Sequence, residues 1–381
     1  YKGARGRLSS GDFRRFDVSA RTVYNPSIIN VHAAVSDNGI TLDQEECPTM
    51  TRRVTIADVA REAGVSLQTV SRVLNNKGEI RPETRSHILA IIERLGYRPN
   101  ALARGLATHK TFALGLVMPD IANPFFSAIA RGAEEAARQA GYSLLLFNTI
   151  EDPAREVEAL GTLAAQRVDG LLLCSSRLPD DELRRRLSEL PATVLVNREL
   201  TEPALSVIRV DNEAEARCAV EFLLSRARRT IAFLAGPVAS HGGSLRALGY
   251  RRALEAAGIA CDPTLVRPCI PHLDGGRSAA HALLSARPDV DAVLCYNDLV
   301  AVGALQACSE MGRRVPEDVA VVGCDDIMLA ALVTPPLTTM RSDQRRMGDE
   351  GIGMLLRAIN QPEAGPEKII LQPELVVRAS A

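Results

Sequence analysis

The sequence has 381 residues, of which 46% are hydrophobic and 24% are charged, and its formal net charge at pH 7 is −1. This length and balance fit a globular protein of two or three domains. No apolar run approaches the roughly 20 residues that a membrane helix needs, and no charged segment followed by an apolar stretch opens the chain, which excludes a recognisable secretory signal.

The eight cysteines are scattered, with no Cys-x-x-Cys pair and no Cys/His spacing typical of a metal site. We therefore predict free thiols in a reducing, cytoplasmic setting, with no metal and no cofactor.

Positive charge is concentrated in one part of the chain. In residues 50–110, Lys and Arg number 11 and Asp and Glu number 5, whereas residues 111–381 carry an excess of acidic residues. Such a segment favours nucleic-acid binding. The alternative, a solvated face of a small helical domain, accounts less well for an excess confined to this segment.

Residues 1–50 show no sustained helical or strand periodicity. We interpret them as a disordered extension or as translated upstream sequence. The chain starts with Tyr1, and Met50 stands just before Arg52-Arg53-Val54-Thr55, so our hypothesis is that Met50 is the natural start. The intact mass of natively expressed protein would test it.

Residues 51–98 contain two short helical patterns, at 56–63 and around 70–74, separated by Gly64-Val65-Ser66. Thr55, with Asp58 three residues on, and Ser66 are placed to cap the two helices, and Gly64 to end the first. This spacing predicts a helix-turn-helix whose second helix turns its polar face to a DNA major groove. The alternative is a plain helical hairpin. The predicted DNA contacts are Thr55, Ser66, Leu67, Gln68, Thr69, Ser71, Arg72 and Asn75.

A third helix is predicted over residues 80–97, with Pro82 in its first turn and Gly96 at its end. The next residues read Tyr97-Arg98-Pro99-Asn100-Ala101-Leu102-Ala103-Arg104-Gly105-Leu106-Ala107. In order and spacing, the three helices and this segment resemble the DNA-binding domain of the lactose repressor (LacI/GalR) family, including its hinge helix. The resemblance implies that Asn100 and Leu106 face DNA, and that Leu106 wedges into the minor groove of a palindromic operator.

The hinge, residues 99–110, contains Gly105 inside its expected helix. Because a glycine in mid-helix costs about 1 kcal/mol and short helices are marginal alone, we predict a segment that folds only on operator DNA. The alternative is an ordinary flexible linker.

From Phe112 onward, short β-rich runs alternate with amphipathic helices, first to about residue 197 and again from 214 to 323. This predicts an α/β domain of two doubly wound parallel-sheet subdomains, with ligand between them at the strand ends. The resemblance extends through residues 111–381 and implies an effector-binding and dimerisation domain like the periplasmic sugar-binding proteins. We assign 111–210 and 326–340 to the N-subdomain and 211–325 and 341–381 to the C-subdomain, with the segments near 327–340 and 344–377 completing both sheets.

Polar and aromatic residues follow several of these strands. The predicted effector contacts are Phe125, Phe126, Asn197, Arg198, Arg246, Asn297 and Asp325. Arg246 and Asp325 match family positions that bind ligand, and a guanidinium fork suits two adjacent hydroxyls. The alternative is that the phenylalanines are core residues and that the Asn and Asp side chains cap turns.

Two positions depart from the family pattern. Cys324 stands where an aromatic residue is common, so the cavity lining can differ from that of relatives. Arg81 stands where a small hydroxyl residue commonly caps the third helix, which predicts a weaker start to that helix.

Other classes of protein fit less well. The sequence has no dinucleotide or phosphate-binding glycine loop, no nucleophile elbow and no cluster of metal ligands, so we do not expect an enzyme. A periplasmic sugar-binding protein would share the fold but would have no use for residues 54–108. We therefore predict a cytoplasmic, homodimeric transcriptional regulator, most simply a repressor, that binds palindromic operator DNA and responds to a sugar-like effector.

Overall fold

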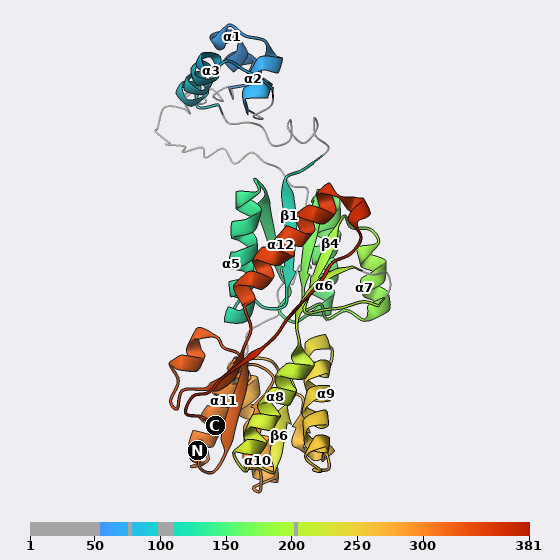
Figure 1. The fold of residues 1–381 in the computed structure, drawn as a ribbon, viewed down its shortest axis with the longest axis vertical. Coiled ribbons are helices and arrows are strands. Elements are labelled where there is room, and N and C mark those ends of the chain that lie inside the picture. Colours follow the sequence, from blue (N-terminus) through green and yellow to red (C-terminus); the bar gives the residue numbers. More distant parts are fainter. Residues whose placement is uncertain (1–53, 75–77, 98–109, 202–204) are drawn as a thin grey trace, which may run out of the picture. The chain divides into compact units, whose positions relative to one another are not determined.

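The computed structural model describes residues 54–74, 78–97, 110–201 and 205–381. It contains two compact units, divided after Tyr97, and each has its own apolar core (Figure 1). The predicted extension at 1–50, most of the predicted hinge, and the predicted DNA contacts Asn75, Asn100 and Leu106 lie outside the described residues.

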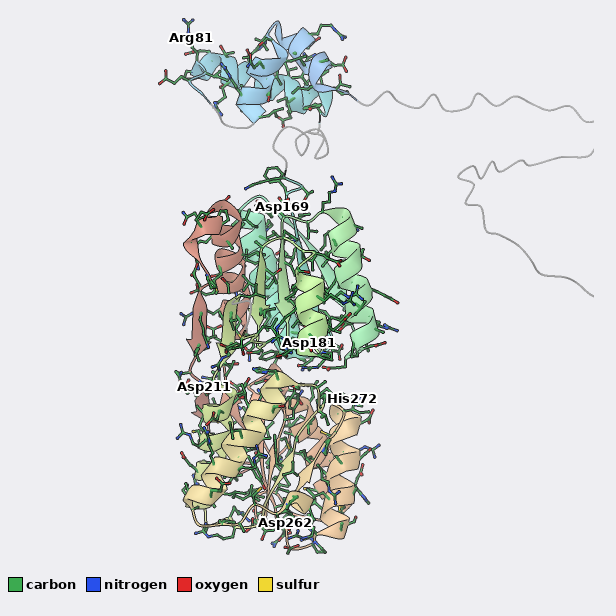
Figure 2. All side chains as sticks on the ribbon, turned by 90° about the vertical axis from the view of Figure 1, so that its right-hand side faces the viewer. Arg81, Asp169, Asp181, Asp211, Asp262 and His272 are labelled. Atoms are coloured by element: carbon green, nitrogen blue, oxygen red, sulfur yellow. The ribbon has the colours of Figure 1, made fainter. Side chains whose placement is uncertain are left out.

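The first unit is a bundle of three helices, as predicted: α1 (Ile56–Ala63), α2 (Leu67–Leu74) and α3 (Pro82–Leu95). Their apolar faces meet in a core of Val59, Ala60, Val70, Val73, Ile88 and Ile91. The predicted ends are confirmed, since Gly64 and Gly96 adopt φ of 63° and 62°, a left-handed conformation that glycine accepts readily. Arg81 (Figure 2) makes no side-chain cap at the start of α3.

The second unit consists of two six-stranded sheets. In the N-subdomain the strand order is β11-β5-β4-β3-β1-β2, and every pair is parallel. Its strands are β1 (Ala113–Met118), β2 (Ser143–Asn148), β3 (Gly170–Cys174), β4 (Thr193–Val196), β5 (Ser206–Val210) and β11 (Lys368–Leu371). β5 was missed by the sequence analysis, although it is almost wholly buried.

In the C-subdomain the order is β12-β10-β9-β8-β6-β7, parallel except for the antiparallel pair β10 and β12. Its strands are β6 (Ile231–Leu234), β7 (Val266–Arg267), β8 (Ala292–Cys295), β9 (Ala320–Asp325), β10 (Thr338–Arg341) and β12 (Glu374–Val376). This arrangement confirms the predicted fold class.

Helices cover both faces of each sheet (Figure 1). Those of the N-subdomain are α5 (Pro124–Gln139), α6 (Pro153–Gln166), α7 (Asp180–Leu187) and α12 (Gln344–Asn360); those of the C-subdomain are α8 (Asn212–Ser225), α9 (His241–Ala256), α10 (Leu273–Ala286) and α11 (Asp298–Glu310). Because both faces are packed, the inner strands β3, β6 and β8 are continuous, fully buried apolar runs, as is typical of parallel sheets.

The chain crosses between the subdomains three times: after β5, after β10 and after β11. Asp211, which caps α8, marks the first crossing (Figure 2). The predicted allocation of residues 326–340 to the N-subdomain was therefore wrong, and that of 341–381 to the C-subdomain was wrong for α12 and β11 but right for β12, which pairs with β10. β10 pairs with β9 in the C-subdomain, whereas α12 and β11 belong to the N-subdomain, because α12 packs on α5 and β11 pairs with β5.

Among the described residues, no helix combines the length and apolarity needed to cross a membrane. The seven cysteines that the structure describes are free, and no grouping of His, Cys, Asp and Glu suited to a metal ion occurs in this part of the chain.

Candidate functional site

The start of α1 is fixed by a reciprocal cap. The Thr55 backbone N–H donates to the Asp58 carboxylate at 2.9 Å, and the Asp58 N–H donates to the Thr55 hydroxyl at 3.4 Å. At the start of α2, Ser66 accepts from the Thr69 N–H at 3.1 Å. These bonds fix the residues at which the two helices begin.

The outer face of α2 carries the predicted base-reading residues. Val70 and Val73 are buried against α1 and α3, whereas Gln68 and Arg72 are exposed. Leu67 is 51% exposed on this otherwise polar surface. Amide, guanidinium and apolar groups are the ones that recognise adenine, guanine and the thymine methyl in a major groove. Thr55 and Ser66 are occupied as caps.

A cavity lies between the two subdomains, at the carboxyl ends of their strands. It is lined by Asn123, Phe125, Phe126, Glu151, Ser175, Arg177, Asn197, Asn212, Ser240, Gly242, Arg246, Pro271, Tyr296, Asn297 and Asp325. Six of the seven predicted effector contacts are in this lining. The exception, Arg198, donates to Asp180 and to the Leu178 carbonyl instead.

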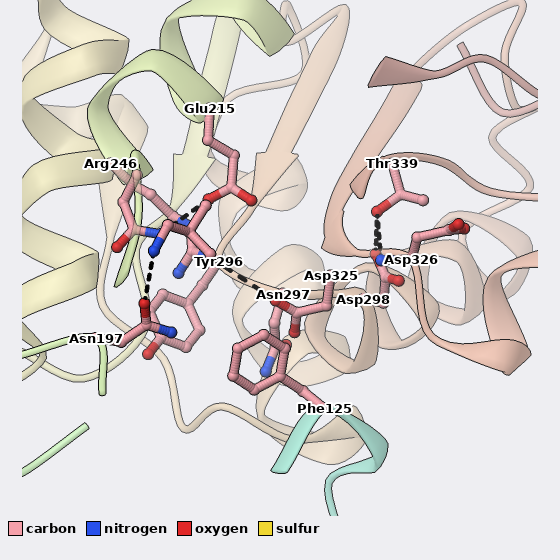
Figure 3. Close-up of polar contacts among 12 residues, drawn as sticks. Phe125, Asn197, Glu215, Arg246, Tyr296, Asn297, Asp298, Asp325, Asp326 and Thr339 are labelled. Carbon is pink, nitrogen blue, oxygen red and sulfur yellow. Dashed lines mark hydrogen bonds and ion pairs between the residues drawn. The ribbon is translucent and has the colours of Figure 1, made fainter. Parts of the chain in front are cut away.

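The Arg246 guanidinium contacts two acidic side chains and one aromatic ring at the cavity (Figure 3). Its Nε donates to Glu215 at 2.7 Å, its Nη2 lies 3.8 Å from the Asp325 carboxylate, and its guanidinium carbon is 5.2 Å from the centre of the Tyr296 ring. Burial alone lowers the pKa of Arg246, but Glu215 and the other acidic neighbours raise it overall. The guanidinium is therefore charged and fixed in orientation.

Asp325 ends β9 beside Arg246, with a φ of 113° that is rare outside glycine. Burial raises the pKa of Asp325 well above its ordinary value, Arg246 opposes the shift, and Asp298 adds to it. Burial therefore disfavours the ionised form of this carboxyl, whereas the neighbouring guanidinium favours it.

Left-handed backbone conformations recur around the cavity. Besides Asp325, the lining residues Glu151, Ser175 and Asn197 have φ of 57°, 46° and 52°. Non-glycine residues adopt such angles only where the surroundings impose them, and they concentrate at functional sites. Here the sharp turns after β2, β3, β4 and β9 direct polar side chains into one space.

The two asparagines among the predicted contacts also serve the backbone. Asn197 accepts from the Val210 N–H at 2.9 Å, and Asn297 accepts from the Val300 N–H at 2.9 Å while donating to the Pro271 carbonyl at 3.3 Å. Asn297 therefore fills the cap role that the sequence analysis offered as the alternative, whereas Asn197 bonds the end of the neighbouring strand β5; both line the cavity.

Phe125 and Phe126 start α5 and pack edge to face, with ring centres 5.1 Å apart. Both are buried in the apolar core of the N-subdomain and also line the cavity. The two interpretations offered for them are thus compatible.

Several lining residues were missed by the sequence analysis. Arg177 follows β3 and donates from Nε and Nη2 to Glu151 at 2.6 and 3.1 Å. Tyr296 follows β8, and its hydroxyl is 2.9 Å from that of Ser240. The polar run Ser175-Ser176-Arg177 directly after a strand was a usable signal of the same kind as Asn197 and Asp325.

Comparisons with known proteins agree with this geometry. Residues 55–100 match the family model for bacterial regulatory proteins of the lacI family, and residues 220–381 match a periplasmic binding protein-like domain. The ribose operon repressor of Escherichia coli K12 is 36% identical over 86% of this chain and 99% of its own length. The HTH-type transcriptional regulator DegA of Bacillus subtilis is 33% identical over 86% of this chain and 98% of its own length.

Solved structures give the same result. A lac repressor dimer bound to operator and the anti-inducer ONPF matches with a TM-score of 0.78 and 30% identity, over 86% of this chain and 99% of that one. The regulator CelR in complex with cellobiose matches with a TM-score of 0.66 and 36% identity, over 86% of this chain and all of that one.

A helix-turn-helix unit joined to a ligand-binding unit of two subdomains defines a DNA-binding transcriptional regulator with an effector cavity. This chain belongs to the lacI family of bacterial regulatory proteins.

Proposed function

We propose that the protein is a cytoplasmic, homodimeric repressor that binds a palindromic operator through α2 and responds to a sugar-like effector held between its subdomains. The cavity carries this proposal: a fixed guanidinium, a carboxyl group beside it, and several amides and hydroxyls converge on one space. Polyhydroxylated molecules offer paired donors and acceptors that such groups bind.

The proposed control is a shift between two arrangements of the subdomains. The three crossings after β5, β10 and β11 connect the halves, and lining residues come from both. An effector that contacts both halves stabilises one arrangement over the other. In a dimer, that shift would change the spacing of the two DNA-binding units and hence operator affinity.

The test is selection of a binding site from random duplex DNA by the purified protein, followed by titration of the selected DNA with and without pentoses and hexoses. We expect a palindromic sequence and a change in affinity with at least one sugar. Sugar binding without any DNA selection would contradict the repressor proposal and favour a sugar-binding protein instead. Turnover of a sugar would favour an enzyme.

A further inference from the structure

The two cationic side chains among the described residues lining the cavity are each matched with a carboxylate. Arg177, with 4% of its side chain exposed, donates from Nε and Nη2 to the two carboxylate oxygens of Glu151 at 2.6 and 3.1 Å. The fork that would otherwise receive a phosphate or carboxylate from a ligand is therefore occupied by the protein's own acid.

Arg246 is matched in a similar way, by Glu215 at 2.7 Å. Asn212 donates to the same Glu215 oxygen at 3.2 Å, whereas the other oxygen, Oε1, is buried and has no hydrogen-bond partner among the described residues. Glu215 does not itself line the cavity, so its charge acts through Arg246. It offsets the attraction of the guanidinium for an anion, because charge interactions are strong where water is excluded.

The helix N-termini at the cavity are also occupied. Lining residues cap three helices: Asn123 caps α5, Ser240 caps α9 and Asn297 caps α11, at N···O distances of 3.0, 3.1 and 2.9 Å. In addition, α5 begins with Pro124, which has no N–H. Helix N-termini commonly bind phosphate through such N–H groups, and here side chains of the protein already accept from them.

An anionic ligand would therefore enter a space in which charges and helix ends are already paired, and burying a charge without a partner is costly. We infer that the cavity selects uncharged polyhydroxylated molecules over their phosphorylated or carboxylated counterparts, and that Glu151 and Glu215 set this selectivity. The inference rests on the proposed function, which places the effector in this cavity, and it adds the charge class of the effector.

The experiment compares matched ligands by calorimetry on the full chain. The pairs are ribose with ribose 5-phosphate, glucose with glucose 6-phosphate, and galactose with galacturonate. For whichever sugar binds, we expect the uncharged member to bind about tenfold more tightly or better, since a hydrogen bond to a charged group is worth about that factor.

Two substitutions test the named residues. Glu151→Gln and Glu215→Gln remove a negative charge but keep an acceptor for the facing guanidinium. Each should shift the ratio of affinities by about tenfold toward the anionic member of the pair. Glu158→Gln, on the exposed face of α6 and outside the cavity lining, is the matched control. Glu151 is partly exposed, so this variant remains informative if Glu215→Gln folds poorly.

The outcomes separate the inference from the proposed function. Equal or tighter binding of a phosphorylated or carboxylated sugar overturns the inference while the effector proposal stands. The same shift in Glu158→Gln as in Glu151→Gln also overturns it, since overall charge would then be responsible. If no member of any pair binds although operator DNA does, both the inference and the sugar-like effector are rejected.

Discussion

Arg246 combines a carboxylate, a second acidic neighbour and an aromatic ring around one guanidinium. Replacing it with alanine removes the fork and leaves Glu215 buried without its partner. We predict that Arg246→Ala weakens effector binding about tenfold or more, with operator binding by the unliganded protein retained. Calorimetry and a gel shift on the same sample measure the two effects. Loss of operator binding as severe as the loss of effector binding would contradict this assignment.

Asp298 illustrates how burial makes a single residue sensitive to pH. It is fully buried at the start of α11, where it accepts from the Thr339 hydroxyl at 2.5 Å and from the Ile327 N–H at 2.8 Å. Burial raises the pKa of Asp298 from 3.8 to about 8, although these two hydrogen bonds favour the ionised form and lower it. Because the folded pKa is the higher one, its contribution to stability is complete below about pH 4 and is lost as the pH rises through about 8.

Asp298→Asn removes this titration. We predict that the free energy of unfolding of the native protein falls, relative to that of Asp298→Asn, between about pH 4 and about pH 8. Urea unfolding at a series of pH values measures the difference. Two curves that stay parallel over this range would show that Asp298 is ionised throughout.

At the scale of elements, glycines set the distance between paired helices. A Cβ on Gly132 of α5 would lie 2.2 Å from the Arg345 carbonyl oxygen of α12, and one on Gly303 of α11 would lie 2.1 Å from the Leu273 oxygen of α10. A Cβ on Gly249 of α9 would lie 2.1 Å from the Glu213 carbonyl oxygen of α8. Helix backbones approach this closely only where no side chain intervenes, so these glycines are required for the observed packing of each pair.

Gly132→Ala tests this packing. We predict a loss of about 1–3 kcal/mol in the free energy of unfolding, because backbone must move to admit a methyl group. Gly161→Ala, within α6, is the control: nothing lies within 4 Å of its added Cβ, so it should gain about 0.5–1 kcal/mol from helix propensity. Denaturant unfolding of both variants checks the opposite signs, and equal effects would contradict the packing argument.

The hinge at residues 99–110 is the element for which the sequence makes the sharpest functional prediction. Leu106→Ala should weaken operator binding, because its side chain is predicted to wedge between base pairs, while effector affinity stays nearly unchanged. A gel shift and calorimetry would measure these properties. If Leu106→Ala and Arg246→Ala changed both properties alike, the proposed division of labour would be wrong.

At the scale of the whole molecule, the distribution of charge predicts different salt dependences for operator binding and effector binding. Residues 50–110 carry an excess of basic over acidic residues, whereas the arginines of the cavity are matched with acids. Operator affinity should therefore fall steeply with salt, by about a thousandfold between about 50 and 200 mM if some six phosphates are contacted. Affinity for an uncharged effector should barely change. Fluorescence anisotropy and calorimetry over the same salt series test this, and a flat operator curve would contradict a phosphate-dominated interface.

Sequence alone determined the features that depend on short spacing. The caps at Thr55 and Ser66, the helix ends at Gly64 and Gly96, and the alternation of strands and helices follow from neighbouring residues. These features need only local hydrogen bonds and the periodicity of apolar residues. Five of the six predicted effector contacts at the cavity follow or end strands, and they meet because the ends of parallel strands lie at one edge of a sheet; the sixth, Arg246, comes from α9.

Only the tertiary structure decided which distant groups meet. Asn197 lines the cavity, but its neighbour Arg198 turns away to Asp180. Glu215 reaches Arg246 from a different helix, and Glu151 reaches Arg177 from the turn after another strand. The allocation of β10 and α12 to the two halves likewise depended on pairing between remote segments. The periodicity of apolar residues determines which face of a helix or strand is buried, but packing across the whole domain determines which other element it contacts.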